Sequence, residues 1–448
     1  MLRVDHLALE NFRCFQVCEV ALHPELTVFV ADNGGGKTAI LDALAIALST
    51  FVDALVSKPL RGIDLSDMRS AADYSQGERA AITTRGLVAG SDMGWERVRT
   101  STSSRGRTTV AGAKEVRAAA QSLREQLKAR RSQITLPLVA CYRTNRLGSG
   151  ALPKHAPERS REAGLSRWRD ASAAGADFQA LYRQDLTDLA RPPKREGFFR
   201  PIHRTTFGLG EAHRPESLLH AVGRAVDVVL APTGWQRIGW DLERNQMVAE
   251  HPQHGQVPTR LLSDGLRTMT TLVGDLARRC VQLNPHMEGD AALRTPGVVL
   301  IDEVDLHLHP RWQQVILDLL RKAFRSLQFI VTTHSPQVIS TVGRESVRVI
   351  RSDGTVTMPR FQTRGVESAD ILARVMDVDP LPDVPETRWL SDYRARVQSG
   401  RDESPEASEL LQRLIAHFGE QHPVMEELAT LKTLQEIKRA RLGLRQGT

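Results

Sequence analysis

The segment at residues 31–38, Ala-Asp-Asn-Gly-Gly-Gly-Lys-Thr, constrains the fold of this 448-residue chain more than any other. It lies between an apolar run, Leu26–Val30, and a helical pattern, Ala39–Ser49. Glycines let such a loop point successive backbone N–H groups at phosphate oxygens, and the following helix N-terminus also attracts anions. The pattern predicts a strand, a phosphate-binding loop and a helix, although Ala31 stands where glycine is commoner.

The residues of this loop would share the contacts to a nucleoside triphosphate. Lys37 is expected to reach the β and γ phosphates, and the Thr38 hydroxyl is expected to ligate Mg²⁺. The candidate nucleotide-binding residues of the loop are Asn33, Gly34, Gly35, Gly36, Lys37 and Thr38. We therefore predict that the chain binds ATP and Mg²⁺.

Two adjacent carboxylates follow a second apolar run. Val298–Ile301 reads as a buried strand, and Asp302 and Glu303 come directly after it. At the end of such a strand Asp302 would complete the Mg²⁺ shell, and Glu303 would act as the general base that orients or deprotonates the attacking water. The pair is weak evidence alone, but a phosphate loop earlier in the chain strengthens it.

Two shorter segments are further candidates. His334 follows the next predicted strand, Phe329–Thr332, and parallel strands end at one edge of a sheet, so His334 could hydrogen-bond the γ-phosphate. Ser263 would cap a helix over Asp264–Gln282 whose first turn contains Gly265, and the start of a helix attracts anions. An ordinary turn histidine and an ordinary helix cap remain the alternatives for these two segments.

The charge of the chain is unevenly distributed. The formal net charge is +7. Residues 93–131 carry ten Lys or Arg against three Asp or Glu, and residues 143–204 carry thirteen against seven. Such asymmetry fits a basic surface that faces nucleic acid or an acidic partner, but it also fits a solvated, arginine-rich surface.

Composition points to a cytoplasmic protein that does not act in a membrane. No apolar stretch approaches the roughly 20 residues that span a bilayer. The first residues carry charges where an export signal needs an apolar core. The four cysteines are expected to be reduced thiols, and their spacing does not suggest a zinc site. They are Cys14, Cys18, Cys141 and Cys280.

The order of predicted elements indicates an α/β fold. Strands alternate with helices after residue 257, which is typical of a mostly parallel sheet, and strand-like alternation near the N-terminus adds an antiparallel portion. Asp353-Gly354 reads as a hairpin turn. We divide the chain into residues 1–50, a basic helical insertion at 51–256 from which a strand at 134–142 returns, residues 257–360, and a C-terminal helical extension at 361–448.

Taken together, the motifs resemble the head of ABC-type ATPases, in the branch shared by RecF, SMC/Rad50 and OLD proteins. The resemblance rests on Asn-Phe-Arg-Cys-Phe at 11–15, the phosphate loop, Leu-Ser-Asp-Gly at 262–265, the segment at 301–310 and Thr-Thr-His-Ser-Pro at 332–336. It implies a homo-oligomer in which two subunits sandwich ATP head to tail.

The resemblance also implies roles for single residues. Lys37, Thr38, Asp302, Glu303 and His334 of one subunit would face Ser263 and Gly265 of another. Arg13 matches a basic residue that approaches the nucleotide, and Asp305 and His309 lie in a segment that communicates across the dimer. A glutamine that links the nucleotide to lobe movement is not assigned, although Gln133 is one possibility.

The C-terminal part is similar to the PtuA ATPases of Septu-type and retron-associated antiphage systems. The similarity covers Phe361–Leu372, the stretch Asp377–Pro385 and predicted helices at Glu406–Phe418 and Val424–Arg441. It implies a separate HNH nuclease subunit, PtuB, and contact with nucleic acid through that complex or the basic insertion, with no nuclease site in this chain. Arg143 departs from the family, which often has glycine there.

Two other readings remain. A RecF-like repair ATPase would use the basic insertion to bind duplex DNA, and its affinity would fall steeply with salt. A scaffold that binds nucleotide without hydrolysing it would show no turnover.

Overall fold

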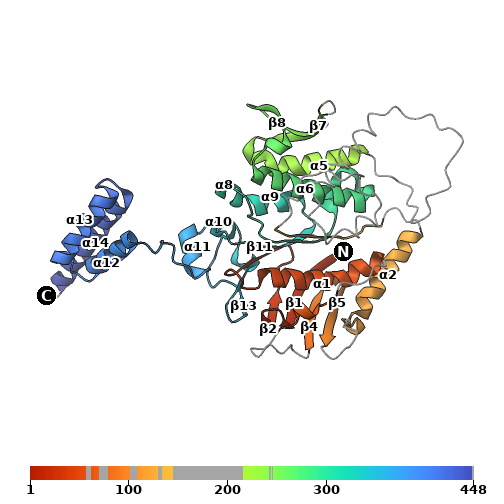
Figure 1. The fold of residues 1–448 in the computed structure, drawn as a ribbon, viewed down its shortest axis with the longest axis horizontal. Coiled ribbons are helices and arrows are strands. Elements are labelled where there is room, and N and C mark those ends of the chain that lie inside the picture. The colour runs from red at the N-terminus through yellow and green to blue at the C-terminus, as the bar shows by residue number, and fades with distance from the viewer. Residues whose placement is uncertain are drawn as a thin grey trace. The chain divides into compact units, whose positions relative to one another are not determined.

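The computed structural model describes residues 1–56, 62–69, 79–100, 108–129, 134–144, 215–241, 244 and 246–445. The chain divides into two compact units, Met1–Met376 and Asp377–Thr448. Figure 1 shows their elements. The strands are β1 (Leu2–Phe12), β2 (Phe15–Ala21), β3 (Leu26–Val30), β4 (Arg79–Val88), β5 (Ser91–Thr100), β6 (Leu138–Tyr142), β7 (Gln236–Asp241), β8 (Gln246–His251), β9 (Gly255–Pro258), β10 (Gly297–Ile301), β11 (Leu327–Thr332), β12 (Val347–Ile350) and β13 (Val356–Thr357). The helices are α1 (Lys37–Val56), α2 (Lys114–Lys128), α5 (Pro215–Leu230), α6 (Asp264–Leu283), α7 (Ala291–Arg294), α8 (Pro310–Gln313), α9 (Ile316–Ala323), α10 (Pro336–Ile339), α11 (Ser368–Arg374), α12 (Pro385–Gln398), α13 (Pro405–Phe418) and α14 (Pro423–Arg445).

The centre of the first unit is a mostly parallel sheet with the strand order β13-β12-β3-β11-β10-β6. Its neighbouring strands are parallel except for the β12–β13 hairpin, which turns at the predicted Asp353-Gly354. Every residue of β3, β10 and β11 is buried, which explains why these strands are mostly apolar. The predicted parallel sheet is confirmed, and it includes β6 beside β10, within the strand predicted at 134–142.

A second sheet is antiparallel, with the order β2-β1-β4-β5. The sequence predicted β1 and β2, but it assigned the β4–β5 hairpin to a helical insertion, and this expectation needs correction. The inward face of β5 explains the difference, because it consists of Trp95, Arg97 and Arg99 rather than aliphatic residues. The Trp95 indole donates to the Ala47 carbonyl at 3.1 Å, and Arg97 donates to the Thr50 hydroxyl at 3.0 Å.

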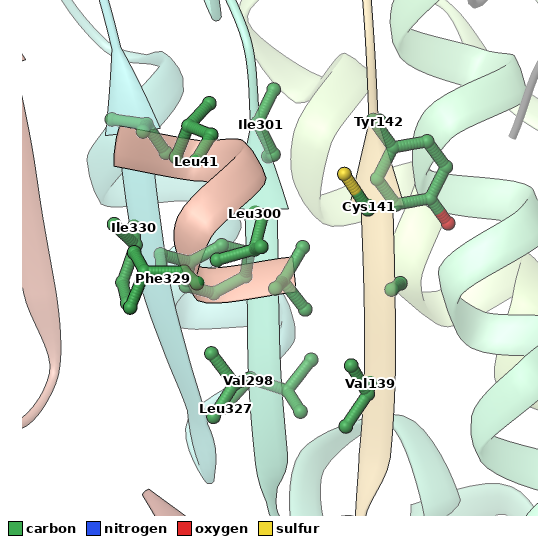
Figure 2. Packing of buried hydrophobic residues seen from close by; sticks show 14 of the residues in the cluster. Leu41, Val139, Cys141, Tyr142, Val298, Leu300, Ile301, Leu327, Phe329 and Ile330 are labelled. Carbon is green, nitrogen blue, oxygen red and sulfur yellow. The ribbon is translucent and has the colours of Figure 1, made fainter. Parts of the chain in front are cut away.

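Helix α1 packs against strands of both sheets. All its residues are buried except Thr38 and Ala54. Figure 2 shows Leu41 of α1 among side chains of β10 and β11. Contrary to the expectation from the sequence, α1 is long and apolar enough to cross a membrane by length and composition; 94% of its apolar window is buried inside the protein, so it is a core helix here.

A buried charge cluster joins α6 to β6. Asp275 is completely buried, and its carboxylate accepts hydrogen bonds from Arg278, Arg279 and the Tyr142 hydroxyl. The Tyr142 ring extends from β6 toward the neighbouring helices (Figure 2). Burial opposes ionisation of Asp275, but the charges of Arg279 and Arg278 prevail and lower its pKa. The cluster therefore fixes α6 against the edge of the parallel sheet.

The segment Arg311–Phe324 has the sequence pattern of one helix, but the structure interrupts it. It forms as α8 and α9, separated by Gln314 and Val315, and Val315 has φ −127° and ψ −15°. Helix α8 begins at Pro310 and is capped by His309, whose imidazole accepts from the Arg311 N–H at 3.3 Å.

The second unit, Asp377–Thr448, contains α12, α13 and α14. Its own apolar core includes Leu390, Tyr393, Val397, Leu414 and Leu428. The sequence predicted α13 and α14 as separate helices. Since α12 supplies Leu390, Tyr393 and Val397, the three helices form one packing unit.

We predict that Asp275→Asn will lower the free energy of unfolding by about 3–5 kcal/mol, because it leaves two buried arginines without their carboxylate. Urea denaturation at neutral pH measures this loss. The matched control is Asp318→Asn, which breaks an exposed pair with Lys322 and should leave the midpoint unchanged. Because the pKa of Asp275 is depressed, the wild type should keep this stability above about pH 4 and lose it as the pH falls further. Equal midpoints for both variants would contradict the prediction.

Candidate functional site

The phosphate loop, residues 31–38, connects β3 to α1. Gly34 and Gly36 have φ values of +77° and +94°, a region that favours glycine. A Cβ atom on Gly36 would lie 2.5 Å from the Phe15 ring, so a side chain there would also clash. The Gly35 N–H donates to the Asp32 carbonyl at 3.0 Å and closes the turn. The loop therefore presents its backbone and the N-terminus of α1 to an anion.

Lys37 lies inside this loop. Its Nζ donates to the carbonyls of Ala31 at 2.8 Å and Asp32 at 2.9 Å, and the residue is buried. Burial lowers the pKa of Lys37, although the nearby carboxylates of Asp302 and Glu303 act in the opposite direction. The predicted phosphate-binding cation therefore sits between the loop and the end of β10.

Asp302 joins three segments at the carboxyl edge of the parallel sheet. The Thr38 hydroxyl donates to its Oδ2 at 3.0 Å, and the Thr332 hydroxyl donates to its Oδ1 at 2.7 Å. The Asp302 N–H donates to the Tyr142 carbonyl at 2.8 Å. One hydroxyl and one carboxylate thus adjoin each other beside the loop. These hard oxygen donors suit Mg²⁺, which takes few protein ligands and completes its shell with water and phosphate.

Glu303 adopts a backbone conformation that only a small share of non-glycine residues show, with φ +49°. Such a conformation costs on the order of 1–3 kcal/mol and persists where neighbours enforce it. Thr332 supplies that restraint, because its hydroxyl accepts from the Glu303 N–H at 2.7 Å and its carbonyl accepts from the Val304 N–H at 2.9 Å. The half-buried Glu303 is therefore fixed next to Asp302.

His334 follows β11, the strand that lies between β3 and β10. It is half-buried. Its two neighbours are anchored, since the Thr333 hydroxyl donates to Asp305 at 2.6 Å and the Ser335 hydroxyl donates to Gln313 at 2.7 Å. The ends of β3, β11 and β10 thus bring the loop, His334 and the carboxylates to one edge.

Arg13 lies in the turn between β1 and β2, with a left-handed φ of +49°. Its guanidinium contacts Asp42 at 2.6 Å and Asp67 at 2.8 Å. Burial opposes its charge, but Asp42 and Asp67 prevail and raise the pKa of Arg13. Cys14 and Phe15, the next residues of the turn, lie against Gly36. The turn therefore forms one wall of the phosphate loop.

Ser263 and Gly265 lie at the start of α6, apart from the phosphate loop. The exposed Ser263 caps the helix, and its hydroxyl accepts from the Leu266 N–H at 3.5 Å. A Cβ atom on Gly265 would lie 2.7 Å from the carbonyl oxygen of His307, which itself has φ +63°. The structure thus brings the helix start together with the turn after Glu303.

Sequence reasoning missed three residues of this site: Thr332, Tyr142 and Asp42. Thr332 was counted only as the last strand residue, although it is a hydroxyl in an otherwise apolar run. Asp42 had a stronger signal, because it is an isolated charge in the apolar stretch Ala39–Leu48. The signal from Tyr142 was weak, since its carbonyl holds Asp302 and any residue has a carbonyl.

Two family models match overlapping parts of the chain. One, described as "AAA domain", matches residues 6–185, and the other, described as "AAA domain, putative AbiEii toxin, Type IV TA system", matches residues 140–340. Between them they include the phosphate loop, Asp302, Glu303 and His334. Both matched models are AAA domains, and the chain is an ATPase.

Relatives of this ATPase include proteins of bacterial defence systems. It is 26% identical over 484 residues to "Retron Ec83 probable ATPase" of Escherichia coli, covering 95% of this chain and 86% of that one. It is 47% identical over 75 residues to "Septu protein PtuA" of Bacillus mycoides (strain KBAB4), covering 17% of this chain and 10% of that one. Among solved structures, the SMC head domain from Thermotoga maritima matches 80% of this chain and all of its own at 13% identity and a TM-score of 0.46.

We predict that Gly265→Ala will lower ATP turnover at least tenfold, since the new methyl group must displace the His307 carbonyl and the turn after Glu303. ATP binding by the subunit should change little, because the phosphate loop is not touched. Steady-state hydrolysis and equilibrium nucleotide binding separate the two effects. Gly223→Ala is the control, because this helical glycine has open space around its Cβ position. Normal turnover in Gly265→Ala would show that the close approach of Gly265 to the His307 carbonyl is not needed for hydrolysis.

Proposed function

We propose that this ATPase is the ATP-binding and ATP-hydrolysing subunit of a bacterial antiphage defence complex that works in the cytoplasm. The observation that carries the proposal is the match to a retron ATPase along 95% of the chain, in a protein whose phosphate loop and carboxylates meet at one edge. The short match to a Septu PtuA protein, at higher identity, supports the same assignment.

The nucleotide contacts follow from the geometry of the site. The loop backbone, including Asn33, and Lys37 would bind the phosphates, while Thr38 and Asp302 would hold Mg²⁺. Bound Mg²⁺ would neutralise charge on the β and γ phosphates. Glu303 would accept a proton from the attacking water, and His334 would donate a hydrogen bond to the γ-phosphate.

The other half of the site would come from a second copy. Ser263 and Gly265 lie at the start of α6, and a helix N-terminus attracts anions, which would suit a γ-phosphate bound to a partner's loop. Since Gly265 packs on His307, the helix start and the segment containing Asp305 and His309 would form one contact surface. ATP would then favour a head-to-tail dimer by binding between two copies.

The dimer would in turn control a separate HNH nuclease subunit. This partner follows from the similarity to PtuA proteins, and nucleic acid would be contacted through the complex or the basic insertion. The count of basic residues overstates the available surface, because Arg97 and Arg99 are buried and donate to the Thr50 hydroxyl and the Ile63 carbonyl. The alternative, a repair ATPase that binds duplex DNA directly, is correspondingly less favoured.

We predict that Glu303→Gln will retain ATP and lose turnover by a factor of about 10²–10⁴, because the amide cannot accept a proton from water. Lys37→Ala should instead lose ATP binding, since the loop then lacks its only lysine. Nucleotide binding and phosphate release are measured on both variants. Turnover that persists in Glu303→Gln would exclude the assigned base, and turnover absent from the parent would favour a nucleotide-binding scaffold.

Affinity purification from the native locus tests the complex. We expect a small HNH protein in stoichiometric amount, identified by mass, whose release or activity depends on ATP. The Glu303→Gln variant should hold this assembly longer, because ATP is not consumed. Recovery of the chain with replication or repair proteins instead would support the repair alternative.

A further inference from the structure

Asp42 is a buried carboxylate next to the phosphate loop. It lies one helical turn after Thr38, on the same face of α1, and is 3% exposed. Each of its oxygens contacts a different arginine: Oδ2 accepts from Arg13 at 2.6 Å, and Oδ1 accepts from Arg143. One buried carboxylate thus joins two cations from segments that are 130 residues apart in the sequence.

The first of these cations lies at the wall of the loop. Arg13 belongs to the turn whose Cys14 and Phe15 lie against Gly36. Its guanidinium also contacts Asp67, yet 30% of the side chain remains exposed. A guanidinium carries five donors, so two carboxylates do not exhaust it. The exposed part of Arg13 is therefore available beside the loop.

The second cation lies at the edge that carries Asp302. Arg143 directly follows Tyr142, whose carbonyl accepts from the Asp302 N–H. The side chain of Arg143 is 39% exposed, whereas that of Asp42 is 4% exposed. Asp42 thus lies beneath two half-exposed guanidiniums, one from the turn beside Gly36 and one from the end of β6.

We propose that Asp42 is a positioning residue for nucleotide binding: it holds Arg13 and Arg143 beside the phosphate loop, where both cations attract the phosphates of ATP. This makes Arg143 a nucleotide-binding residue in addition to those already assigned. The proposal rests on the proposed function of the site. Without Asp42 the two guanidiniums would repel each other and turn to solvent, and their charges would leave the loop.

A purely structural role accounts less well for this arrangement. Buried ion pairs often contribute little net stability, because desolvation offsets the attraction. A clamp that served packing alone would also bury its arginines, as Asp275 does with Arg278 and Arg279. The contrast between these two aspartates is that the arginines of Asp42 stay half-exposed at the nucleotide edge.

The test measures binding of a slowly hydrolysed ATP analogue with Mg²⁺ to the full chain by calorimetry. Asp42→Asn keeps the shape and removes the charge, and we expect its Kd to rise about tenfold. Arg143→Gln changes a half-exposed side chain, so the fold should tolerate it better than Asp42→Asn. It should also raise the Kd for the analogue. The control is Asp53→Asn, which removes another buried carboxylate of α1, eleven residues further along the helix.

A double-mutant cycle separates positioning from stability. If Asp42 acts through Arg13, then Asp42→Asn should weaken binding much less in an Arg13→Gln background than in the wild type. The effect of Asp42→Asn on the urea midpoint should be the same with and without Arg13→Gln. Unchanged affinity in both Asp42→Asn and Arg143→Gln, or full additivity with Arg13→Gln, would overturn the proposal. A wild-type chain that binds no ATP would instead overturn the proposed function itself.

Discussion

The structure depends on the burial of α1 between two sheets. Because nearly every side chain of this helix is enclosed, its N-terminus cannot shift without disrupting contacts to both sheets. The phosphate loop is therefore held on one side by the ends of the parallel strands and on the other by the turn that contains Phe15. Apolar packing thus determines where the charged groups of the site lie.

Hydrogen bonds that involve threonine hydroxyls position the two carboxylates at the end of β10. Thr332 receives the Glu303 N–H and donates to Asp302, so one side chain orients both carboxylates. Glu303 has a left-handed φ, and the Thr332 hydroxyl holds its N–H in place. Conformational strain is stored where the protein needs fixed positions, and the surrounding packing maintains it.

The sequence predicted the parallel core and the elements that hold most of the candidate site residues. The strands β3, β10 and β11 could be predicted because burial on both faces makes them mostly apolar, and because glycines, carboxylates or a histidine follow them. The β4–β5 hairpin was missed because its inward face uses Arg97 and Arg99, which satisfy carbonyls and hydroxyls instead of filling apolar space. The ion pairs of Asp42 are long-range contacts, and no local pattern encodes which arginine meets which acid.

The place of β6 has a consequence for how such a chain can change. In the described sheet β6 is the edge strand, hydrogen-bonded to β10 on one side. Segments attached to an edge strand can lengthen, shorten or acquire new surface chemistry while the inner strands keep their partners. Yet the last residue of β6 touches the backbone of Asp302. The sequence after β6 can therefore change without loss of hydrogen bonds within the sheet, whereas a displacement of Tyr142 would act directly on the backbone of Asp302.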